Sequence, residues 1–228
     1  MNTTPILIYP SILAADMANL ERDCRRALDG GADGLHVDIM DGHFVPNLSM
    51  GPAVVAALRQ ALGSDVELHV HLMITDPGRY APAFIKAGAN TVLIHIEAAG
   101  DIPATLQAIR DQGIRAGITV NPETPAASIQ DLVTANAVDE VLCMTVHPGF
   151  GGQSFIESVL PKMKEIRSWA PQLPISVDGG IDQESAPRSA GAGANVLLAG
   201  TSLFAAPDMT AAISTMRAAC NAAYSSNL

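Results

Sequence analysis

Four side chains that can bind a metal ion fall at the ends of predicted β-strands, namely His36, Asp38, His71 and Asp178. They belong to three separate strand-loop-helix units, and each is expected at the carboxyl end of its strand. Imidazole nitrogens and carboxylate oxygens that converge on one point bind a divalent metal. Two aspartates in such a place can also take up and return protons. The residue types therefore predict a metal site that includes two acid–base candidates, Asp38 and Asp178.

The alternation of side chains along a strand supports this interpretation. In the segment 34–40 it places His36, Asp38 and Met40 on one face, and in the segment 66–73 it places His69, His71 and Met73 on one face. One inward histidine is more often a satisfied core residue than a ligand. Two histidines and two aspartates at three strand ends are different, because an apolar interior does not bury them without a shared partner.

The elements that position these residues repeat along the chain. Short apolar β-branched runs predict strands at 6–13, 34–40, 66–73, 91–96, 115–120, 138–146, 174–177 and 195–199. Alanine-rich segments predict helices at 17–29, 51–62, 78–88, 101–112, 125–135, 154–168, 183–190 and 209–223. This alternation predicts an α/β fold, a (β/α)8 TIM barrel, with residues 1–228 as one domain. A doubly wound open sheet is the alternative, but it rarely needs so many regular units.

Three glycine-bearing turns follow the last predicted strands of the barrel. They contain Gly149, Gly151 and Gly152 around Phe150, then Gly179 and Gly180, and finally Gly200 before Thr201. Such turns let backbone N–H groups approach an anion closely, and barrels of this kind often bind phosphate in this sector. A single turn of this type is weak evidence, whereas three in one sector predict a phosphate site.

Composition excludes several classes of function. Lys and Arg number 13 against 23 Asp and Glu, a net charge of −10 that disfavours nucleic acid or an anionic membrane as partner. Three cysteines without C-x-x-C spacing argue against disulfides and thiolate metal sites, and the N-terminus lacks signal-peptide features. We therefore expect a cytoplasmic protein. The only lysines, Lys86, Lys162 and Lys164, lie in predicted outer helices, which excludes imine chemistry at a strand end.

The chain resembles the ribulose-phosphate 3-epimerase family over nearly its whole length. The matching stretches are PSILAAD at 10–16, HVDIMDGHFVPN at 36–47, HLM at 71–73, MTVHPGFGGQSF at 144–155, VDGGI at 177–181 and Gly200-Thr201. Two positions depart from the family pattern. His69 stands where an aspartate is usual and can change the hydrogen bonds behind the metal ligands, and Thr201 replaces a serine but keeps the hydroxyl.

The resemblance implies that His36, Asp38, His71 and Asp178 bind one divalent cation and that Asp38 and Asp178 are the two proton-transfer groups. It also implies the remaining substrate contacts. These are made by Ser11, His71 and Asp178, and by the phosphate-binding residues Gly149, Phe150, Gly151, Gly152, Gly179, Gly180, Gly200 and Thr201.

The implied reaction is the interconversion of D-ribulose 5-phosphate and D-xylulose 5-phosphate in the pentose phosphate pathway. Inverting a carbon next to a ketone requires proton removal on one face and return on the other, through an enediolate that a metal stabilises. Metal ligation makes an aspartate a poorer base. Our hypothesis is that Met40, Met73 and Met144 exclude water from the pocket and so restore the basicity of the aspartates. His95, at the end of another strand, is a further candidate for the pocket lining.

Other interpretations stay open at this point. A ketohexose-phosphate 3-epimerase, such as one acting on allulose 6-phosphate, differs only in pocket shape, and a non-catalytic phosphosugar-binding barrel would not need both aspartates. A decarboxylase of the orotidine-monophosphate type needs a strand-end lysine, which the segment 38–41 lacks. The donor set suits Zn, Fe, Mn or Co equally. The resemblance also implies a homo-oligomer.

Overall fold

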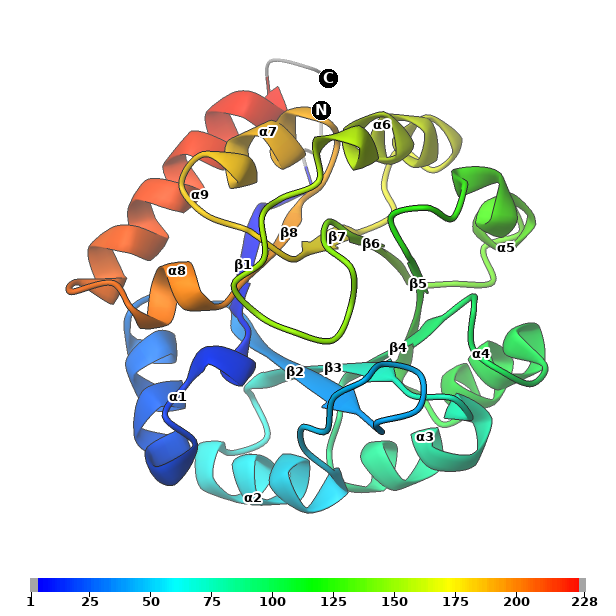
Figure 1. Cartoon of the computed structure of the whole chain (residues 1–228), viewed down its shortest axis with the longest axis horizontal. Helices are drawn as coiled ribbons and strands as arrows, with labels where there is room; N and C mark the ends of the chain where they lie inside the picture. Colours follow the sequence, from blue (N-terminus) through cyan, green and yellow to red (C-terminus); the bar gives the residue numbers. More distant parts are fainter. Residues whose placement is uncertain (1–3, 226–228) are drawn as a thin grey trace.

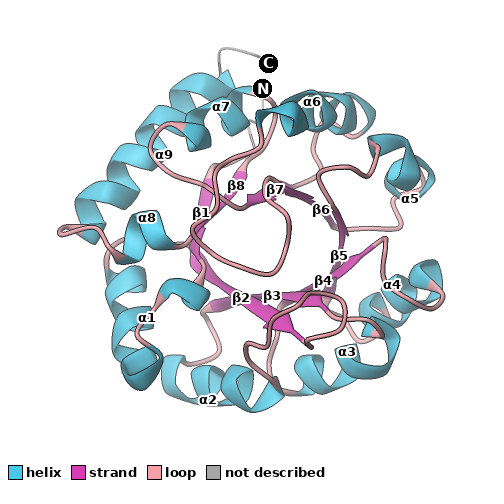
Figure 2. Cartoon of the chain, in the orientation of Figure 1, coloured by secondary structure: helices cyan, strands magenta, loops and turns pink. Residues whose placement is uncertain are grey.

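Eight parallel strands form the wall of a barrel in the computed structural model, which describes residues 4–225 (Figures 1 and 2). The strands are β1 (Leu7–Pro10), β2 (Gly34–Met40), β3 (Glu67–Met73), β4 (Thr91–His95), β5 (Arg115–Val120), β6 (Glu140–Met144), β7 (Ile175–Asp178) and β8 (Val196–Ala199). Each strand pairs with its neighbour along the chain from β2 to β8, and β8 pairs with β1. The predicted (β/α)8 barrel is therefore confirmed.

Helices surround the strands and follow the predicted alternation (Figure 2). They are α1 (Leu20–Asp29), α2 (Pro52–Leu62), α3 (Pro77–Lys86), α4 (Ile102–Arg110), α5 (Gln130–Thr134), α6 (Leu160–Trp169), α7 (Ser185–Gly191), α8 (Thr201–Phe204) and α9 (Met209–Ser225). The short α8 was not predicted, because four residues are too few to show a helical period. The first and last three residues of the expected domain 1–228 lie outside the described residues.

The predicted first strand, 6–13, was too long. β1 ends at Pro10, and a 3₁₀ turn covers Ile12–Ala14. The apolar run continues because Ile12 is fully buried in the core, so hydrophobicity alone did not show where the strand ends. Directly after β1, Ser11 forms an isolated parallel bridge with His36. This bridge brings β1 to β2 and makes the barrel nearly continuous.

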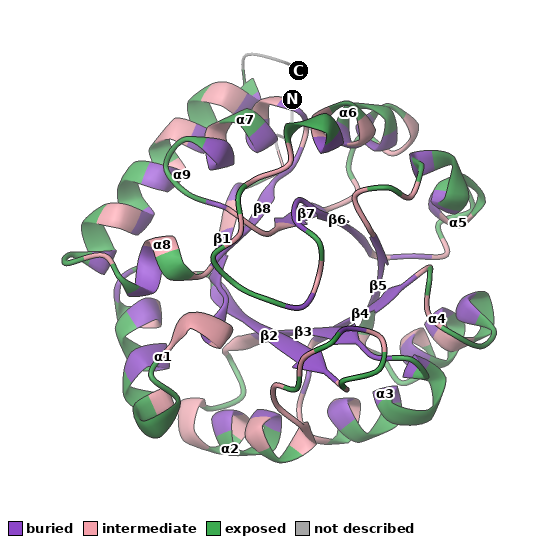
Figure 3. Ribbon diagram, viewed as in Figure 1, coloured by how far each residue is buried: buried purple, intermediate pink, exposed green. Residues whose placement is uncertain are grey.

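The main hydrophobic core lies between the strands and the helices, as the buried strands and the inward faces of the helices show in Figure 3. The cysteines Cys24, Cys143 and Cys220 are buried there with free thiols. The interior of the barrel is different in character, because it buries His36, His69, His71, His95 and Glu140 completely or nearly so. Buried polar groups need partners, and the partners of these residues define the site described below. Among the described residues, no helix is both long and apolar enough to span a membrane.

Candidate active site

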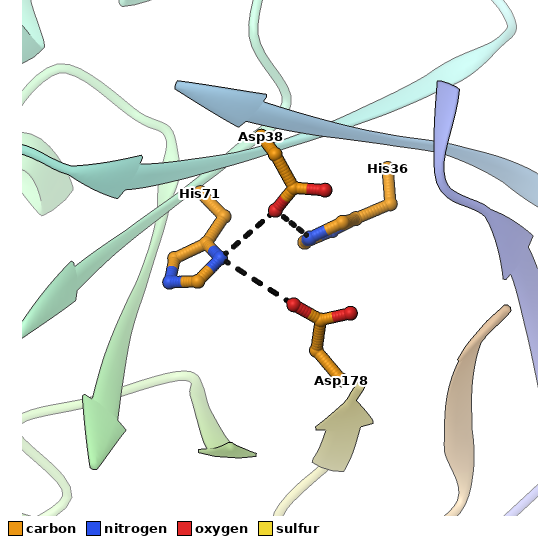
Figure 4. Close-up of side chains that lie close together, drawn as sticks. All are labelled: His36, Asp38, His71 and Asp178. Carbon is orange, nitrogen blue, oxygen red and sulfur yellow. Dashed lines mark hydrogen bonds and ion pairs between the residues drawn. The ribbon is translucent and has the colours of Figure 1, made fainter. Parts of the chain in front are cut away.

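His36, Asp38, His71 and Asp178 meet at the carboxyl end of the barrel (Figure 4). The Nε2 atom of His36 lies 2.9 Å from Oδ1 of Asp38, and the Nδ1 atom of His71 lies 3.2 Å from the same oxygen. Oδ2 of Asp178 lies 4.0 Å from Nδ1 of His71. One potential ligand atom from each residue falls within 4.8 Å of the others. The structure therefore brings together the four residues that the sequence singled out.

Strand register places these side chains. Asp38 of β2 and His71 of β3 are direct cross-strand partners, so their side chains leave the sheet side by side. Asp178 is the last residue of β7 and reaches the cluster from the other side of the barrel (Figure 4). Ser11 fixes the remaining oxygen of Asp38, because its hydroxyl donates a hydrogen bond of 2.6 Å to Oδ2. The orientation of the Asp38 carboxylate is thus set by three neighbours.

The chemistry of the donor set fits a divalent cation. Two carboxylates and two imidazole nitrogens that face one another are all hydrogen-bond acceptors when the imidazoles are neutral and present their unprotonated nitrogens. Acceptors at these distances repel one another unless a proton or a cation lies between them. A mixed set of nitrogen and oxygen ligands on rigid strands suits a first-row divalent metal. This cluster and the inward position of all four residues support a metal cofactor.

The two carboxyl groups of the cluster differ in basicity. Burial raises the pKa of Asp178 well above its ordinary value, and the negative charge of Asp38 raises it further. Burial acts on Asp38 in the same direction, but His36 and His71 outweigh it and hold the pKa of Asp38 well below its ordinary value. Two neighbouring carboxyl groups whose pKa values are pushed apart form a natural pair of proton donor and acceptor.

A cavity of about 570 Å³ opens beside the cluster. Ser11, Asp38 and Asp178 line it, whereas His36 and His71 are wholly buried and do not line it. Met40, Met73 and Met144 also line it and expose almost no surface, as a wall that excludes water requires. The predicted phosphate-binding residues line the same cavity, namely Gly149, Phe150, Gly151, Gly152, Gly179, Gly180, Gly200 and Thr201.

The glycine turns have a backbone that other residues rarely adopt. Gly179 and Gly180 have φ angles of 112° and 63°, and a Cβ atom on Gly180 would lie 2.7 Å from the backbone nitrogen of Phe155. Gly149 has a φ of 127°, and its carbonyl accepts a hydrogen bond of 2.7 Å from the side chain of Asn47. The loop between β6 and α6 that contains it crosses the mouth of the barrel in Figure 1. These turns bring backbone close to the cavity, as the sequence analysis expected for an anion site.

Comparison with known proteins identifies the family. The family model described as ribulose-phosphate 3 epimerase matches residues 7–204. The chain belongs to this family. The ribulose-phosphate 3-epimerase of Bacillus subtilis (strain 168) is 48% identical over 217 residues, which cover 93% of this chain and 98% of the relative. That of Escherichia coli (strain K12) is 41% identical over 215 residues, with 92% and 94% covered. The protein is therefore an isomerase of the epimerase class.

Solved structures show the same barrel in enzymes of other kinds. A 3-hexulose-6-phosphate synthase from Salmonella typhimurium superposes with a TM-score of 0.69 at 16% identity, covering 97% of this chain and 100% of that chain. A thiamine phosphate pyrophosphorylase from Pyrococcus furiosus gives a TM-score of 0.66 at 16% identity, with 96% and 98% covered. At such low identity the likeness shows the fold alone.

The prediction for one histidine was wrong, and the sequence did not reveal the contacts of two carboxylates. His95 does not line the cavity. It is fully buried, and its Nε2 lies 2.9 Å from Nε2 of His71. Glu97 and Glu140 each lie within hydrogen-bond distance of a buried histidine, Glu97 3.1 Å from His95 and Glu140 2.9 Å from His69. The alternation of side chains along β4 and β6 could have suggested that His95 and Glu140 point inward, but not that they reach residues of other strands.

Sequence reasoning also missed a cationic group at the glycine-rich side of the cavity. Arg188 of α7 lines the cavity and forms an ion pair with Glu157. Its guanidinium lies over the ring of Phe155, 5.7 Å from the centroid. The helix that contains it follows the Gly179-Gly180 turn directly, and this position in the sequence is the signal that could have found it.

Proposed function

We propose that this epimerase interconverts D-ribulose 5-phosphate and D-xylulose 5-phosphate by moving the proton on carbon 3. The observation that carries the proposal is the placement of two carboxyl groups, Asp38 of β2 and Asp178 of β7, which meet from different sides of the barrel at a cavity that the glycine turns also line. The names of the relatives from Bacillus subtilis and Escherichia coli support the same substrate pair.

Asp38 and Asp178 carry out the proton transfers. One carboxylate takes the proton from carbon 3, which leaves a planar enediolate, and the other carboxyl group gives a proton to the opposite face. The C–H bond broken on one face is replaced by a C–H bond on the other, and the two aspartates exchange protonation states. The Ser11 hydroxyl orients the Asp38 carboxylate for this transfer through its hydrogen bond to Oδ2.

His36, Asp38, His71 and Asp178 would hold a divalent metal ion, with Zn, Fe, Mn and Co all compatible with this donor set. When bound, the ion supplies Lewis-acid stabilisation of the negative charge that develops on the substrate oxygens. The three methionines, Met40, Met73 and Met144, exclude water from this side of the cavity. Exclusion of water raises the basicity of the aspartates and strengthens every electrostatic interaction there.

The glycine turns would bind the phosphate of the substrate. Gly149 to Gly152, Gly179, Gly180, Gly200 and Thr201 offer backbone N–H groups, and the Thr201 hydroxyl adds a further donor. Arg188 supplies positive charge on the same side of the cavity, which matches a phosphate in an otherwise acidic protein. We place the protein in the pentose phosphate pathway of the cytoplasm, as a homo-oligomer in which residues 1–228 form one catalytic domain.

The test is NMR of the purified, metal-loaded protein with D-ribulose 5-phosphate in deuterated water. We expect D-xylulose 5-phosphate that carries deuterium at carbon 3. If the protein with verified metal content gives no product, the pentulose assignment is wrong, and D-allulose 6-phosphate is the next substrate to supply. Binding of both sugars without turnover would mean that the barrel is a phosphosugar-binding protein.

A further inference from the structure

Behind each histidine of the metal cluster lies a second histidine, followed by a carboxylate. In the first relay, Nδ1 of His36 lies 2.8 Å from Nδ1 of His69, and Nε2 of His69 lies 2.9 Å from Oε1 of Glu140. In the second relay, Nε2 of His71 lies 2.9 Å from Nε2 of His95, and Nδ1 of His95 lies 3.1 Å from Glu97. Both relays therefore run from a metal-facing nitrogen to a carboxylate two hydrogen bonds away.

The two carboxylates determine the direction of these hydrogen bonds. An ionised carboxylate only accepts, so the nitrogen of His69 that faces Glu140 must carry a proton. A neutral imidazole has one N–H, and Nδ1 of His69 is then an acceptor for the N–H on Nδ1 of His36. His36 consequently presents an unprotonated Nε2 to the cluster. The same reasoning from Glu97 through His95 leaves Nδ1 of His71 unprotonated, which is again the nitrogen that faces the cluster.

The first relay is the more enclosed of the two. Glu140 lies on β6, four strands away from His36 of β2 around the eight-stranded barrel, and only 6% of its side chain is exposed. The ring of Tyr9 lies against His69 with 5.3 Å between the centroids. Glu97 of the second relay is 23% exposed and also accepts hydrogen bonds from the backbone of Asn121 and the hydroxyl of Thr124. The charge of Glu140 is therefore the less screened by solvent.

We propose that His69 and Glu140 are positioning residues that hold His36 in the tautomer that presents an unprotonated Nε2 to the metal ion. The inference rests on the proposed metal site and deepens it, because it assigns part of the metal affinity to a carboxylate across the barrel that is not a ligand. Hydrogen-bond partners behind a metal-binding histidine typically change metal affinity about 10- to 100-fold when they are removed.

The decisive variant is Glu140→Gln, with Glu67→Gln as its matched control. Glutamine keeps an oxygen that can accept from His69, but it also offers N–H donors and has no charge, so it no longer imposes one tautomer. Glu67 is likewise a carboxylate of the barrel strands, but it contacts Arg115 and Thr91 instead of a histidine relay. A merely structural role of Glu140 would alter stability without altering the tautomer of His36.

Two measurements separate these roles. Calorimetric titration of the metal-free proteins with Zn²⁺ should give a Kd about tenfold higher for Glu140→Gln than for wild type, and a Kd within about twofold of wild type for Glu67→Gln. Nitrogen-15 NMR of the histidines in the Zn²⁺-loaded wild type should show N–H on Nδ1 of His36 and on Nε2 of His69. The double variant His69→Asp/Glu140→Gln places a carboxylate next to His36 directly and should restore Zn²⁺ affinity to within about threefold of wild type.

The outcomes distinguish the inference from the proposed function. A wild-type protein that does not bind Zn²⁺, Mn²⁺, Fe²⁺ or Co²⁺ would overturn the proposed metal site. A wild type that binds Zn²⁺, together with an unchanged Kd in Glu140→Gln, would overturn the inference and leave the metal site intact. If Glu140→Gln does not fold, the wild-type spectrum decides. A proton on Nδ1 of His69 in the Zn²⁺-loaded wild type would also overturn the inference.

Discussion

The cavity lining has two parts, a metal-facing side of strand residues and a glycine-rich side of turns. The metal-facing side consists of strand residues that are buried and hydrogen-bonded, and even Asp178, the most accessible of the four, exposes only 15% of its side chain. The glycine-rich side consists of loops, where Gly179 and Gly180 have positive φ angles and Phe150 is 54% exposed. Proton removal by one carboxylate and proton return by another need fixed side chains, and binding a phosphate needs accessible backbone.

This difference assigns separate kinetic roles to the two sides. Changes on the strand side should lower turnover, because they act on groups that contact the reacting carbon. Changes on the loop side should raise KM, because they act on a part of the substrate that does not react.

Asp178→Asn should lower kcat by about 10³- to 10⁴-fold, because an amide cannot take up or return the proton. KM should change by less than about threefold, since the phosphate contacts are intact. The asparagine variant should still exchange the carbon-3 proton of one epimer with deuterated water through Asp38. NMR of each epimer, with the metal content verified, measures all three effects.

The control for Asp178→Asn is Glu123→Gln. Glu123 is an exposed carboxylate of a loop and forms an ion pair with His147 outside the cavity. Its removal should leave kcat and KM unchanged. An Asp178→Asn variant that retained more than about a tenth of the wild-type kcat would show that this aspartate is not a proton-transfer group.

Gly180→Ala should raise KM for the phosphorylated sugar by about 30-fold and reduce kcat much less. The added Cβ would lie 2.7 Å from the backbone nitrogen of Phe155, at a φ of 63° that disfavours alanine, so the turn must move. Activity on D-ribulose, which lacks the phosphate, should fall much less. The ratio of kcat/KM for the two sugars measures the effect.

The control for this loop variant is Gly151→Ala, because a Cβ on Gly151 meets nothing within 4 Å and its φ is not positive. Its KM should stay within about threefold of wild type. An equal loss of activity on both sugars in Gly180→Ala would mean that the turn supports the whole site and not the phosphate alone.

Met73→Ser should lower kcat about tenfold through the entry of water beside the aspartates. Met73 is almost completely buried and lines the cavity, so Met73→Leu, which keeps the apolar wall, is the matched control. Steady-state kinetics of the two variants make the comparison. An unchanged kcat in Met73→Ser would refute the hypothesis that the methionines act by excluding water.

Glu97→Gln should lower the free energy of unfolding at pH 7 by about 1 kcal/mol, after allowance for solvent screening. Burial would raise the pKa of Glu97, but hydrogen bonds from His95, Thr124 and the backbone of Asn121 lower it from 4.5 to about 2. The ionised form thus stabilises the fold above about pH 4.5, and this contribution is lost as the pH falls toward 2. Denaturant unfolding of both proteins should show a difference that shrinks over this range.

The sequence predicted most of the strand side, because alternation along β2 and β3 determines which residues point inward. It predicted the end of β1 poorly, since Ile12 continues the apolar run into a 3₁₀ turn. The sequence indicated that His69 lies behind the metal ligands, but it did not indicate the carboxylate that His69 contacts. His69 and Glu140 are separated by 71 positions and meet only because the barrel closes, and one sequence has no signal for such a contact.

The order of the strands along the chain also determines when each metal ligand becomes available during synthesis on the ribosome. His36, Asp38 and His71 emerge early, but Glu140 follows only with β6 and Asp178 only with β7. The bridge between Ser11 and His36 joins the first two strands, and β1 finds its other neighbour only when β8 is complete. A nascent chain can therefore bind a metal ion with an incomplete set of ligands. Capture of the ion with all four ligands is therefore a step that follows the synthesis of β7.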